Sequence, residues 1–455
     1  MRRLRQLAER TPAARERYVD LLRALAITMV VLGHWGITVI GYDRAGRPTG
    51  HSALGDLPWM WPLTWAAQVM PVFFLVGGFA NAASLTTHRA RGGDATGWLI
   101  DRSSRLVRPT TALLVVLALG AAVASLRHAD PTEVRTVVWF ATIPLWFLVA
   151  YLSVVPLTPP MYALHRRFGL AVPLVLVGVV ALGDLARLLG PTGPANANYL
   201  FGWLAVHQLG FAWYDTRTPE VPARRRLPTS RRAGTALLAA GLVALVLLTL
   251  VGPYPVAMLN VPGERLDNLA PPSLALLAVA TAQVGLILLL RDPAERWLRR
   301  SGPWQVVIAV NTVVLTVFLW HLTAAVLLVG LLDALGVLPT PRVGSGAWWA
   351  WRVPWLLALA VMLTALVAVF GPIEARSRRR RTGGPERRPG PLTQGPLATA
   401  LVATGYVGVV LGLLLNSLTA KTAPEPLGLP APALVAYLAG AGVLRLLRSG
   451  WGSRG

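Results

Sequence analysis

Cysteine is absent from the 455-residue sequence, and Lys421 is its only lysine. The lack of cysteine excludes disulfide bonds, a thiolate nucleophile and cysteine-ligated zinc or iron–sulfur centres. Charged residues are scarce as well: they make up 14% of the chain, whereas a soluble domain usually carries about 25%. This deficit excludes a soluble enzyme, a disordered chain and a coiled coil.

Apolar residues are abundant, at 54% of the chain, which is typical of a polytopic membrane protein. A membrane-spanning helix needs about 20 apolar residues, and the sequence contains twelve candidate segments. They cover approximately residues 19–41, 63–86, 109–126, 137–157, 169–189, 199–214, 234–252, 272–290, 305–332, 348–372, 396–416 and 430–447. The sequence therefore predicts an all-α bundle of membrane helices.

Basic residues greatly outnumber acidic ones, 43 against 20, which gives a formal net charge of +23. Such an excess occurs in nucleic-acid-binding proteins, but the positions of the arginines favour another explanation. If the N-terminus is cytoplasmic, roughly three quarters of the basic residues lie on the cytoplasmic side of the predicted spans, as the positive-inside rule requires. We therefore expect a multi-pass protein of the plasma membrane, with both termini in the cytoplasm and no nucleic-acid partner.

The predicted spans divide the chain into four parts. Residues 1–17 form a basic cytoplasmic tail, and residues 18–372 form a ten-helix membrane domain. Residues 373–395 form a basic linker rich in proline and glycine, and residues 396–455 form an appendage with two further helices. No histidine or acidic residue lies within the apolar runs of this appendage, so we assign it no chemistry.

Three histidines lie inside predicted spans, and the predicted topology places all of them toward the outer half of the membrane: His34, His207 and His321. Ionisable groups at membrane depth are costly and are commonly functional. The alternative for each is a histidine that is hydrogen-bonded between helices. Acidic residues lie only in loops or near span ends, which argues against a proton relay made of carboxylates.

The first predicted helix carries a cation and a titratable base on one face. Arg23 and His34 are eleven residues apart, which is close to a whole number of turns at about 100° per residue. Asp20 precedes Arg23 by three residues and is within reach for an ion pair. The alternative is that Arg23 extends toward the membrane surface while His34 only packs, and the pattern alone does not separate these interpretations.

A second group of arginines precedes the third predicted span, at spacings of three residues: Arg102, Arg105 and Arg108. Planar guanidinium groups bind phosphates through paired hydrogen bonds. These side chains are therefore candidates for binding an anionic cytosolic ligand or a lipid phosphate. The alternative is a basic anchor that only sets the orientation of the helix in the membrane.

At these residues the chain resembles the acyltransferase-3 family of bacterial integral-membrane acyltransferases, which includes O-acetylases of cell-surface polysaccharides. The shared features are Arg-x10-His from Arg23 to His34, Arg-x-x-Arg at Arg105 and Arg108 before Pro109, and a Phe-rich run at residues 70–79. Gly77 stands where many members have serine, so no hydroxyl role is carried over to it. The resemblance covers about residues 15–372.

The resemblance implies transfer of an acyl group, often acetyl, from cytoplasmic acyl-CoA to a hydroxyl, or sometimes an amine, of a sugar or lipid-linked glycan. Family members use the first-helix histidine for catalysis, and His34 suits a general base near neutral pH. The cytoplasmic arginines, with Arg23, suit the phosphates of CoA. Supporting or acceptor-side roles fall to Asp20, His207 and His321. Acyl-CoA, the acceptor and membrane lipids are the expected partners, and we expect neither a metal nor a bound cofactor.

Two other functions stay open at this point. A transporter or flippase for a lipid-linked sugar would use Arg23 and the histidines to line a pathway, but the lack of mid-span carboxylates and of visible internal repeats counts against it. An inactive acyltransferase-like scaffold is disfavoured by the intact Arg-x10-His. The separate pair His51 and Asp56 matches an H-x4-D pattern but has no partner motif, so it receives no role.

Overall fold

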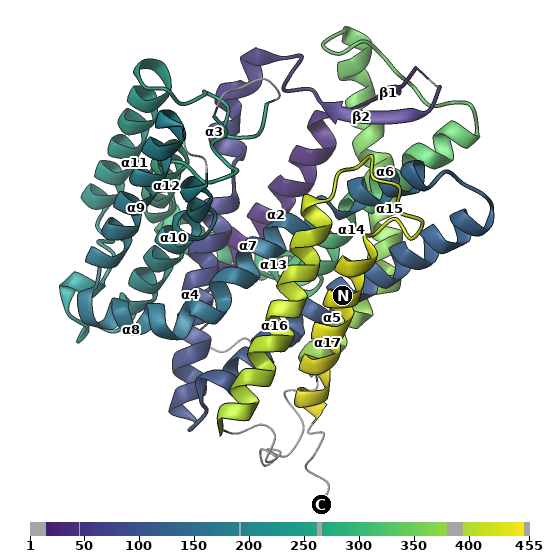
Figure 1. The fold of residues 1–455 in the computed structure, drawn as a ribbon. Helices are drawn as coiled ribbons and strands as arrows, with labels where there is room; N and C mark the ends of the chain where they lie inside the picture. The colour runs from purple at the N-terminus through teal and green to yellow at the C-terminus, as the bar shows by residue number, and fades with distance from the viewer. Residues whose placement is uncertain (1–14, 45, 191–192, 262–265, 380–394, 450–455) are drawn as a thin grey trace, which may run out of the picture. The chain divides into compact units, whose positions relative to one another are not determined.

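The computed structural model describes residues 15–44, 46–190, 193–261, 266–379 and 395–449 (Figure 1). Most of the predicted tail and of the predicted linker therefore lies outside the described residues. Helices dominate the described part of the chain, which confirms the all-α prediction. Two compact units are present: Met1–Gly33, Ser52–Thr87 and Val154–Asn311 form the first, and His34–His51, His88–Ser153 and Thr312–Gly455 form the second.

The first unit is built around α10, which is buried along nearly its whole length. Its elements are most of α2 (Arg17–Ile37), η1 (Pro58–Leu63), α3 (Thr64–Ala67), α4 (Met70–Ala90), η2 (Val155–Leu157), α8 (Thr158–Phe168), α9 (Ala171–Leu189), η3 (Pro194–Ala197), α10 (Asn198–Asp215), η4 (Ala223–Arg225), α11 (Arg231–Val246), η5 (Leu247–Val251), α12 (Leu274–Leu298) and α13 (Ser301–Thr312). Close packing of α4 on α10 depends on Gly78, because a Cβ there would overlap the carbonyl oxygen of His207.

The second unit is centred on α5, which packs against α6, α14, α15, α16 and α17. Its elements are the end of α2, β1 (Thr38–Tyr42), β2 (Pro48–Ser52), α5 (Ala95–Leu126), α6 (Pro131–Thr142), α7 (Leu145–Val154), α14 (Val314–Ala334), α15 (Gly346–Arg379), α16 (Gly395–Leu418) and α17 (Ala431–Ser449). Helices α16 and α17 form a tight hairpin through small residues. A Cβ on Gly440 would overlap the carbonyl oxygen of Gly405, so α17 has no room for a larger side chain at this crossing.

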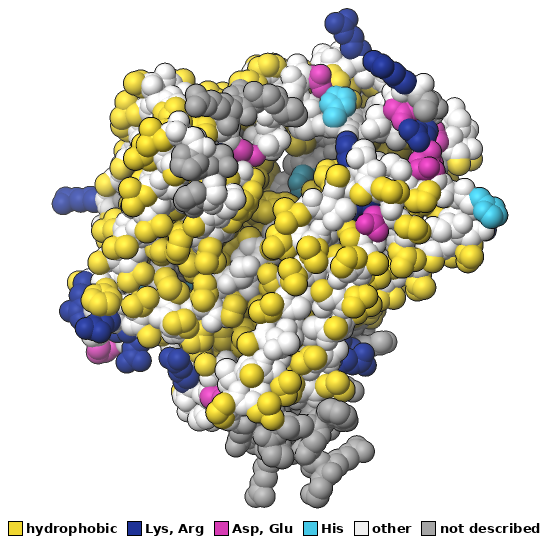
Figure 2. Space-filling view, viewed as in Figure 1, with side chains coloured by type: hydrophobic (Ala, Val, Ile, Leu, Met, Phe, Trp, Pro, Cys, Tyr) yellow, Lys and Arg dark blue, Asp and Glu magenta, His cyan; other side chains and the backbone are white. Residues whose placement is uncertain are grey.

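Within the described residues, 11 helical segments are long and apolar enough to cross a membrane. The protein is thus a multi-pass membrane protein. Figure 2 shows hydrophobic side chains over the helices of each unit, with charged side chains gathered near helix ends. On α9, Leu174, Leu182 and Leu189 are exposed. The predicted span 199–214 forms α10, which is not among the 11. Its apolar character is reduced by Asn198, His207, Gln208 and Asp215.

Three predicted spans are interrupted, and the hairpin β1–β2 takes the end of the first predicted span together with the loop after it. In the span expected at 63–86, Gln68 and Val69 separate α3 from α4. The span expected at 137–157 divides into α6 and α7 at Pro144, which has no N–H to continue the helix. The span expected at 305–332 divides into α13 and α14 at Val313. There the carboxylate of Glu374 accepts hydrogen bonds from the backbone N–H of Leu315 and Thr316, which begins a new helix with an acidic cap.

The C-terminal hairpin is anchored to the second unit by Arg135 of α6. This side chain is fully buried, although the sequence placed it in a loop. Its guanidinium donates to five oxygens at 2.8–3.3 Å, namely Oδ1 and the carbonyl of Asn416 and the carbonyls of Thr419, Ala420 and Gly428. These carbonyls lie at and beyond the end of α16, where a cation is favourable.

Candidate active site

Two of the three span histidines meet in the second unit. Nδ1 of His34, in the last turn of α2, lies 2.8 Å from Nε2 of His321 on α14. The rings are nearly parallel, with an interplanar angle of 3° and centroids 5.1 Å apart. His321 is fully buried, whereas His34 is partly exposed. Of the supporting and acceptor-side roles that the sequence left open to His321, the supporting role has a geometric basis, because His321 can orient the ring of His34.

The carbonyl of Phe318 determines which nitrogens of the pair carry protons. Nδ1 of His321 lies 2.6 Å from this oxygen, and because a carbonyl only accepts, Nδ1 is the protonated nitrogen. Neutral His321 then offers Nε2 as an acceptor, so His34 donates through its own Nδ1. Nε2 of His34 consequently keeps a free lone pair, and no described residue hydrogen-bonds to it. This is the tautomer that a general base requires.

The backbone around the histidine pair is held by side-chain donors. Trp35 donates through Nε1 to the carbonyl of His321 at 2.9 Å, and Trp355 donates to the carbonyl of Trp35 at 3.2 Å. The hydroxyl of Thr38 donates to the carbonyl of His34 at 2.5 Å. These bonds fix the end of α2 against α14 and α15, which limits the positions that the imidazole of His34 can take.

Arg23 lies on the same helix as His34, but its partners belong to the first unit. It pairs with Asp20, as the three-residue spacing predicted, and its Nε donates to Oδ1 of Asn311 at 2.7 Å. The other carboxylate oxygen of Asp20 accepts from Arg15 at 2.6 Å, and Asp20 is only 5% exposed. The guanidinium of Arg23 is therefore fixed by a buried carboxylate and an amide.

The arginines of α5 differ in their surroundings. Each step of three residues turns a helix by about 300°, so the three side chains spread over part of the helix surface rather than forming one line. Arg108 is exposed and Arg105 is partly exposed. Arg102 donates to the hydroxyl of Tyr151 at 3.0 Å, and its buried Nε has no partner among the described residues.

Tyr406 on α16 is a residue of this region that the sequence analysis missed. Its side chain is buried, and its hydroxyl has no hydrogen-bond partner in the part of the chain that the structure describes. The hydroxyl lies within electrostatic range of Arg102 and of Tyr151. A single tyrosine in an apolar run gives no sign of the direction it faces, so the sequence carried no signal for this contact.

A row of aromatic rings connects the histidine pair with Arg102 inside the second unit. The ring of His321 lies 6.1 Å from that of Phe318, which lies 5.4 Å from Phe147. Phe147 stacks on Tyr151 at 5.8 Å, and the Tyr151 hydroxyl accepts from Arg102. His34 on α2 and Arg102, the first arginine of α5, thus belong to one packed structure.

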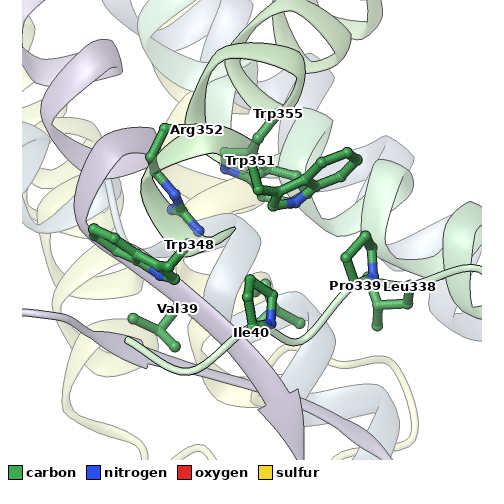
Figure 3. A pocket seen from close by; sticks show the side chains of 9 residues that line it. Val39, Ile40, Leu338, Pro339, Trp348, Trp351, Arg352 and Trp355 are labelled. Carbon is green, nitrogen blue, oxygen red and sulfur yellow. The ribbon is translucent and has the colours of Figure 1, made fainter. Parts of the chain in front are cut away.

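A small pocket in the second unit lies between β1, the loop after α14 and the first turns of α15 (Figure 3). It is lined by Val39, Ile40, Leu338, Pro339, Pro341, Trp348, Trp351, Arg352 and Trp355. The wall residue Trp355 contacts Trp35, whose indole in turn bonds to the backbone of His321. The pocket wall and the histidine pair therefore share a hydrogen-bonded support.

His207 lies in the first unit, where it is fully buried and its Nε2 is 3.0 Å from Nδ2 of Asn81. It takes no part in the His34–His321 pair, which leaves the interhelical hydrogen bond as its observed role. Among the described residues, no three histidine, aspartate or glutamate side chains gather as a metal site would need.

Comparison with known protein families identifies the family of the part of the chain that carries these residues. The family model of an acyltransferase domain, Acyl_transf_3, matches residues 16–371. The chain belongs to the acyltransferase-3 family. This acyltransferase-3 protein matches no curated protein and no solved structure. Its membership confirms the resemblance drawn from Arg-x10-His and makes the chain an acyltransferase of the multi-pass membrane type, while α16 and α17 lie beyond the matched residues.

Proposed function

We propose that this protein transfers an acyl group, acetyl in the simplest case, from acyl-CoA to a hydroxyl of a cell-surface glycan or glycolipid. The observation that carries the proposal is the proton arrangement of the histidine pair, which leaves Nε2 of His34 free to act as a base. In this reaction Nε2 takes the proton of the acceptor hydroxyl while the hydroxyl oxygen attacks the thioester carbonyl carbon. A carbon–oxygen bond forms, the carbon–sulfur bond breaks, and the imidazolium returns the proton to the departing CoA thiolate.

The His34–His321 hydrogen bond becomes more favourable during this reaction. When Nε2 of His34 accepts a proton, the ring becomes a cation, and its Nδ1–H donates a charge-assisted bond to Nε2 of His321. Such bonds are about twice as strong as neutral ones. His321 is thus a positioning residue that also stabilises the charge developing on the base.

For the donor, we assign the phosphates of CoA to the arginines of α5. Three guanidinium groups on one helix suit a polyphosphate, and the predicted topology puts them on the cytoplasmic side, where acyl-CoA is made. The unpaired Nε of Arg102 and the unpaired hydroxyl of Tyr406 add two donors to this region.

The proposal is tested by measuring CoA release. The purified protein in lipid nanodiscs is mixed with acetyl-CoA and an envelope extract of the source cells, and free thiol is followed with a thiol reagent. Because the chain has no cysteine, the protein contributes no background. We expect release that depends on the extract, and we expect His34→Ala to abolish it.

His128→Ala is the matched control, since His128 is exposed in the turn after α5. It is expected to keep the activity of the unmodified protein. Undiminished release by His34→Ala would refute the assignment of the base. Movement of a labelled glycolipid across the membrane without any CoA release would instead identify the protein as a transporter.

A further inference from the structure

Basic side chains gather at one end of the first unit, near α8 (Figure 2). They come from the last turn of α8 and from η4 and the residue after it, and η4 packs against α8. Arg166, Arg167 and Arg224 are exposed, and Arg226 is half-buried. No carboxylate of a described residue forms an ion pair with these four side chains. Because like charges repel one another, an anion bound here would lower the free energy of the array.

A buried carboxylate fixes the position of η4. Asp215, at the end of α10, is 3% exposed, and its Oδ2 lies 2.6 Å from Nη2 of Arg225 in η4. Its Oδ1 accepts a hydrogen bond from the hydroxyl of Tyr162 at 3.0 Å, and Nε2 of His165 lies 3.3 Å from its Oδ2. Tyr162 and His165 both belong to α8 and are buried. The carboxylate of Asp215 therefore joins η4 to α8 and α10.

The backbone of η4 is held against neighbouring elements as well. The N–H of Leu170, in the turn between α8 and α9, donates to the carbonyl of Arg224 at 2.8 Å. Gly169 has a φ of 61°, which favours glycine, and a Cβ there would overlap the same carbonyl oxygen. Just after η4, the N–H of Leu227 donates to the carbonyl of Ala212 on α10 at 3.1 Å. The basic side chains of η4 therefore extend from a backbone that is held before and after them.

The positive-inside rule alone does not account for this fixed loop. The rule depends on the number of basic residues near the ends of the spans and requires no particular geometry. Here a buried carboxylate, two buried side chains of α8 and two backbone hydrogen bonds hold the segment that carries the arginines. Ordering a loop costs conformational entropy. A loop that is ordered before its ligand arrives binds more tightly, because this cost does not fall on the binding step.

Exposed apolar side chains beside these arginines indicate the kind of anion. Leu164 and Phe168 of α8 are exposed and lie four residues apart, so they share one side of the helix. Leu174 and Val175, in the first turn of α9, are exposed as well. Because α9 is long and apolar enough to cross a membrane, its exposed side chains are expected to face lipid chains. An anion that joins a phosphate to acyl chains suits both kinds of surface.

We propose that the arginines of α8 and η4, with the apolar side chains beside them, bind the headgroup of an anionic phospholipid. Arg166 and Arg224 donate to the phosphate oxygens, since guanidinium groups bind phosphate through paired hydrogen bonds, and the acyl chains lie on α9. A free phosphate would satisfy the arginines but would leave the apolar side chains uncovered, which favours the lipid. The proposal concerns the first unit alone and does not rest on the proposed acyl transfer.

Bound lipid is counted by native mass spectrometry of the full-length protein, which is delipidated in an uncharged detergent and titrated with phosphatidylglycerol or phosphatidylcholine. We expect phosphatidylglycerol to bind about tenfold more tightly, and the variant Arg166→Gln with Arg224→Gln to lose this preference, because hydrogen bonds between charged groups are removed. Arg299→Gln with Arg300→Gln is the matched control. It removes the same charge from two exposed residues after α12 in the same unit, and it should keep the preference.

Asp215→Asn separates the fixed geometry from the number of charges. It makes the net charge more positive but removes the ion pair with Arg225, so the variant, once shown to elute as a folded particle, should bind phosphatidylglycerol less tightly. Equal binding of the two lipids, the same loss in the control variant, full preference in folded Asp215→Asn, or displacement of the lipid by an equal concentration of inorganic phosphate would each overturn the proposal. Because no acyl-CoA is present, these results are independent of those for His34→Ala.

Discussion

Replacing His321 by phenylalanine tests whether His321 supports His34 by accepting the hydrogen bond from its Nδ1–H. The substitution keeps an aromatic ring on α14 but removes the acceptor for Nδ1–H of His34. In the ground state the lost bond is neutral, whereas in the transition state the donor is an imidazolium. A hydrogen bond to a charged group contributes about 1.5–3 kcal/mol, and each 1.36 kcal/mol changes a rate about tenfold. We therefore expect kcat to fall about 10- to 150-fold, with the KM for acetyl-CoA unchanged.

Further variants distinguish a positioning role of His321 from simple damage to the fold. Glutamine at position 321 retains a carbonyl oxygen that can accept from His34, so His321→Gln should recover part of the lost kcat. His34→Ala should cost about 10²- to 10⁴-fold, the usual contribution of a general base. The double variant should be no slower than His34→Ala, because His321 acts through His34.

The assay is CoA release in nanodiscs at saturating acetyl-CoA, and each variant is first shown to elute as a folded particle in size-exclusion chromatography. Full kcat in folded His321→Phe would refute the reasoning. So would a double variant whose loss equals the product of the two single losses, because His321 would then act independently of His34. A change confined to the KM would assign His321 to substrate binding.

Three other predictions concern the donor site and the C-terminal hairpin. Changing Arg105 and Arg108 together to alanine should raise the KM for acetyl-CoA, and an unchanged KM in steady-state kinetics would contradict a phosphate role. Tyr406→Phe should also raise the KM for acetyl-CoA, without lowering the melting temperature, because its hydroxyl has no partner among the described residues. Tyr437→Phe is the control: it loses the hydrogen bond to the Val107 carbonyl, so it should lower the melting temperature and leave the KM unchanged. Arg135→Met removes five hydrogen bonds. At about 0.6 kcal/mol for each bond in a membrane, the folded protein should lose about 3 kcal/mol of stability. An unchanged denaturation midpoint would exclude Arg135 as the anchor of the hairpin.

Local and compositional features were predictable from the sequence. Apolar runs at membrane length identified the multi-pass class because the lipid interior requires such runs whatever the tertiary structure. The pairing of Asp20 with Arg23 followed from helix geometry, since residues three apart are neighbours on any helix. The family followed from Arg-x10-His and Arg-x-x-Arg, which are patterns within single helices.

Features that depend on distant residues were not predictable. The break at Val313 depends on Glu374, which is 58 and 59 residues from the backbone groups it caps. Arg135 was counted as a loop residue because its buried acceptors lie more than 280 residues later in the chain. Neither partner can be identified from periodicity, because an amphipathic pattern indicates that a helix face is buried but not what covers it.

The same distinction applies to the candidate site. The sequence by itself determined that His34 is a titratable group on the first membrane helix and that two other histidines, His207 and His321, lie inside predicted spans. Only the tertiary structure decided that His321, 287 residues away, is its partner, and that the carbonyl of Phe318 sets the tautomer of both rings. The physical reason is that the position of a proton on an imidazole depends on the atoms that face each nitrogen, and those atoms are brought there only by folding.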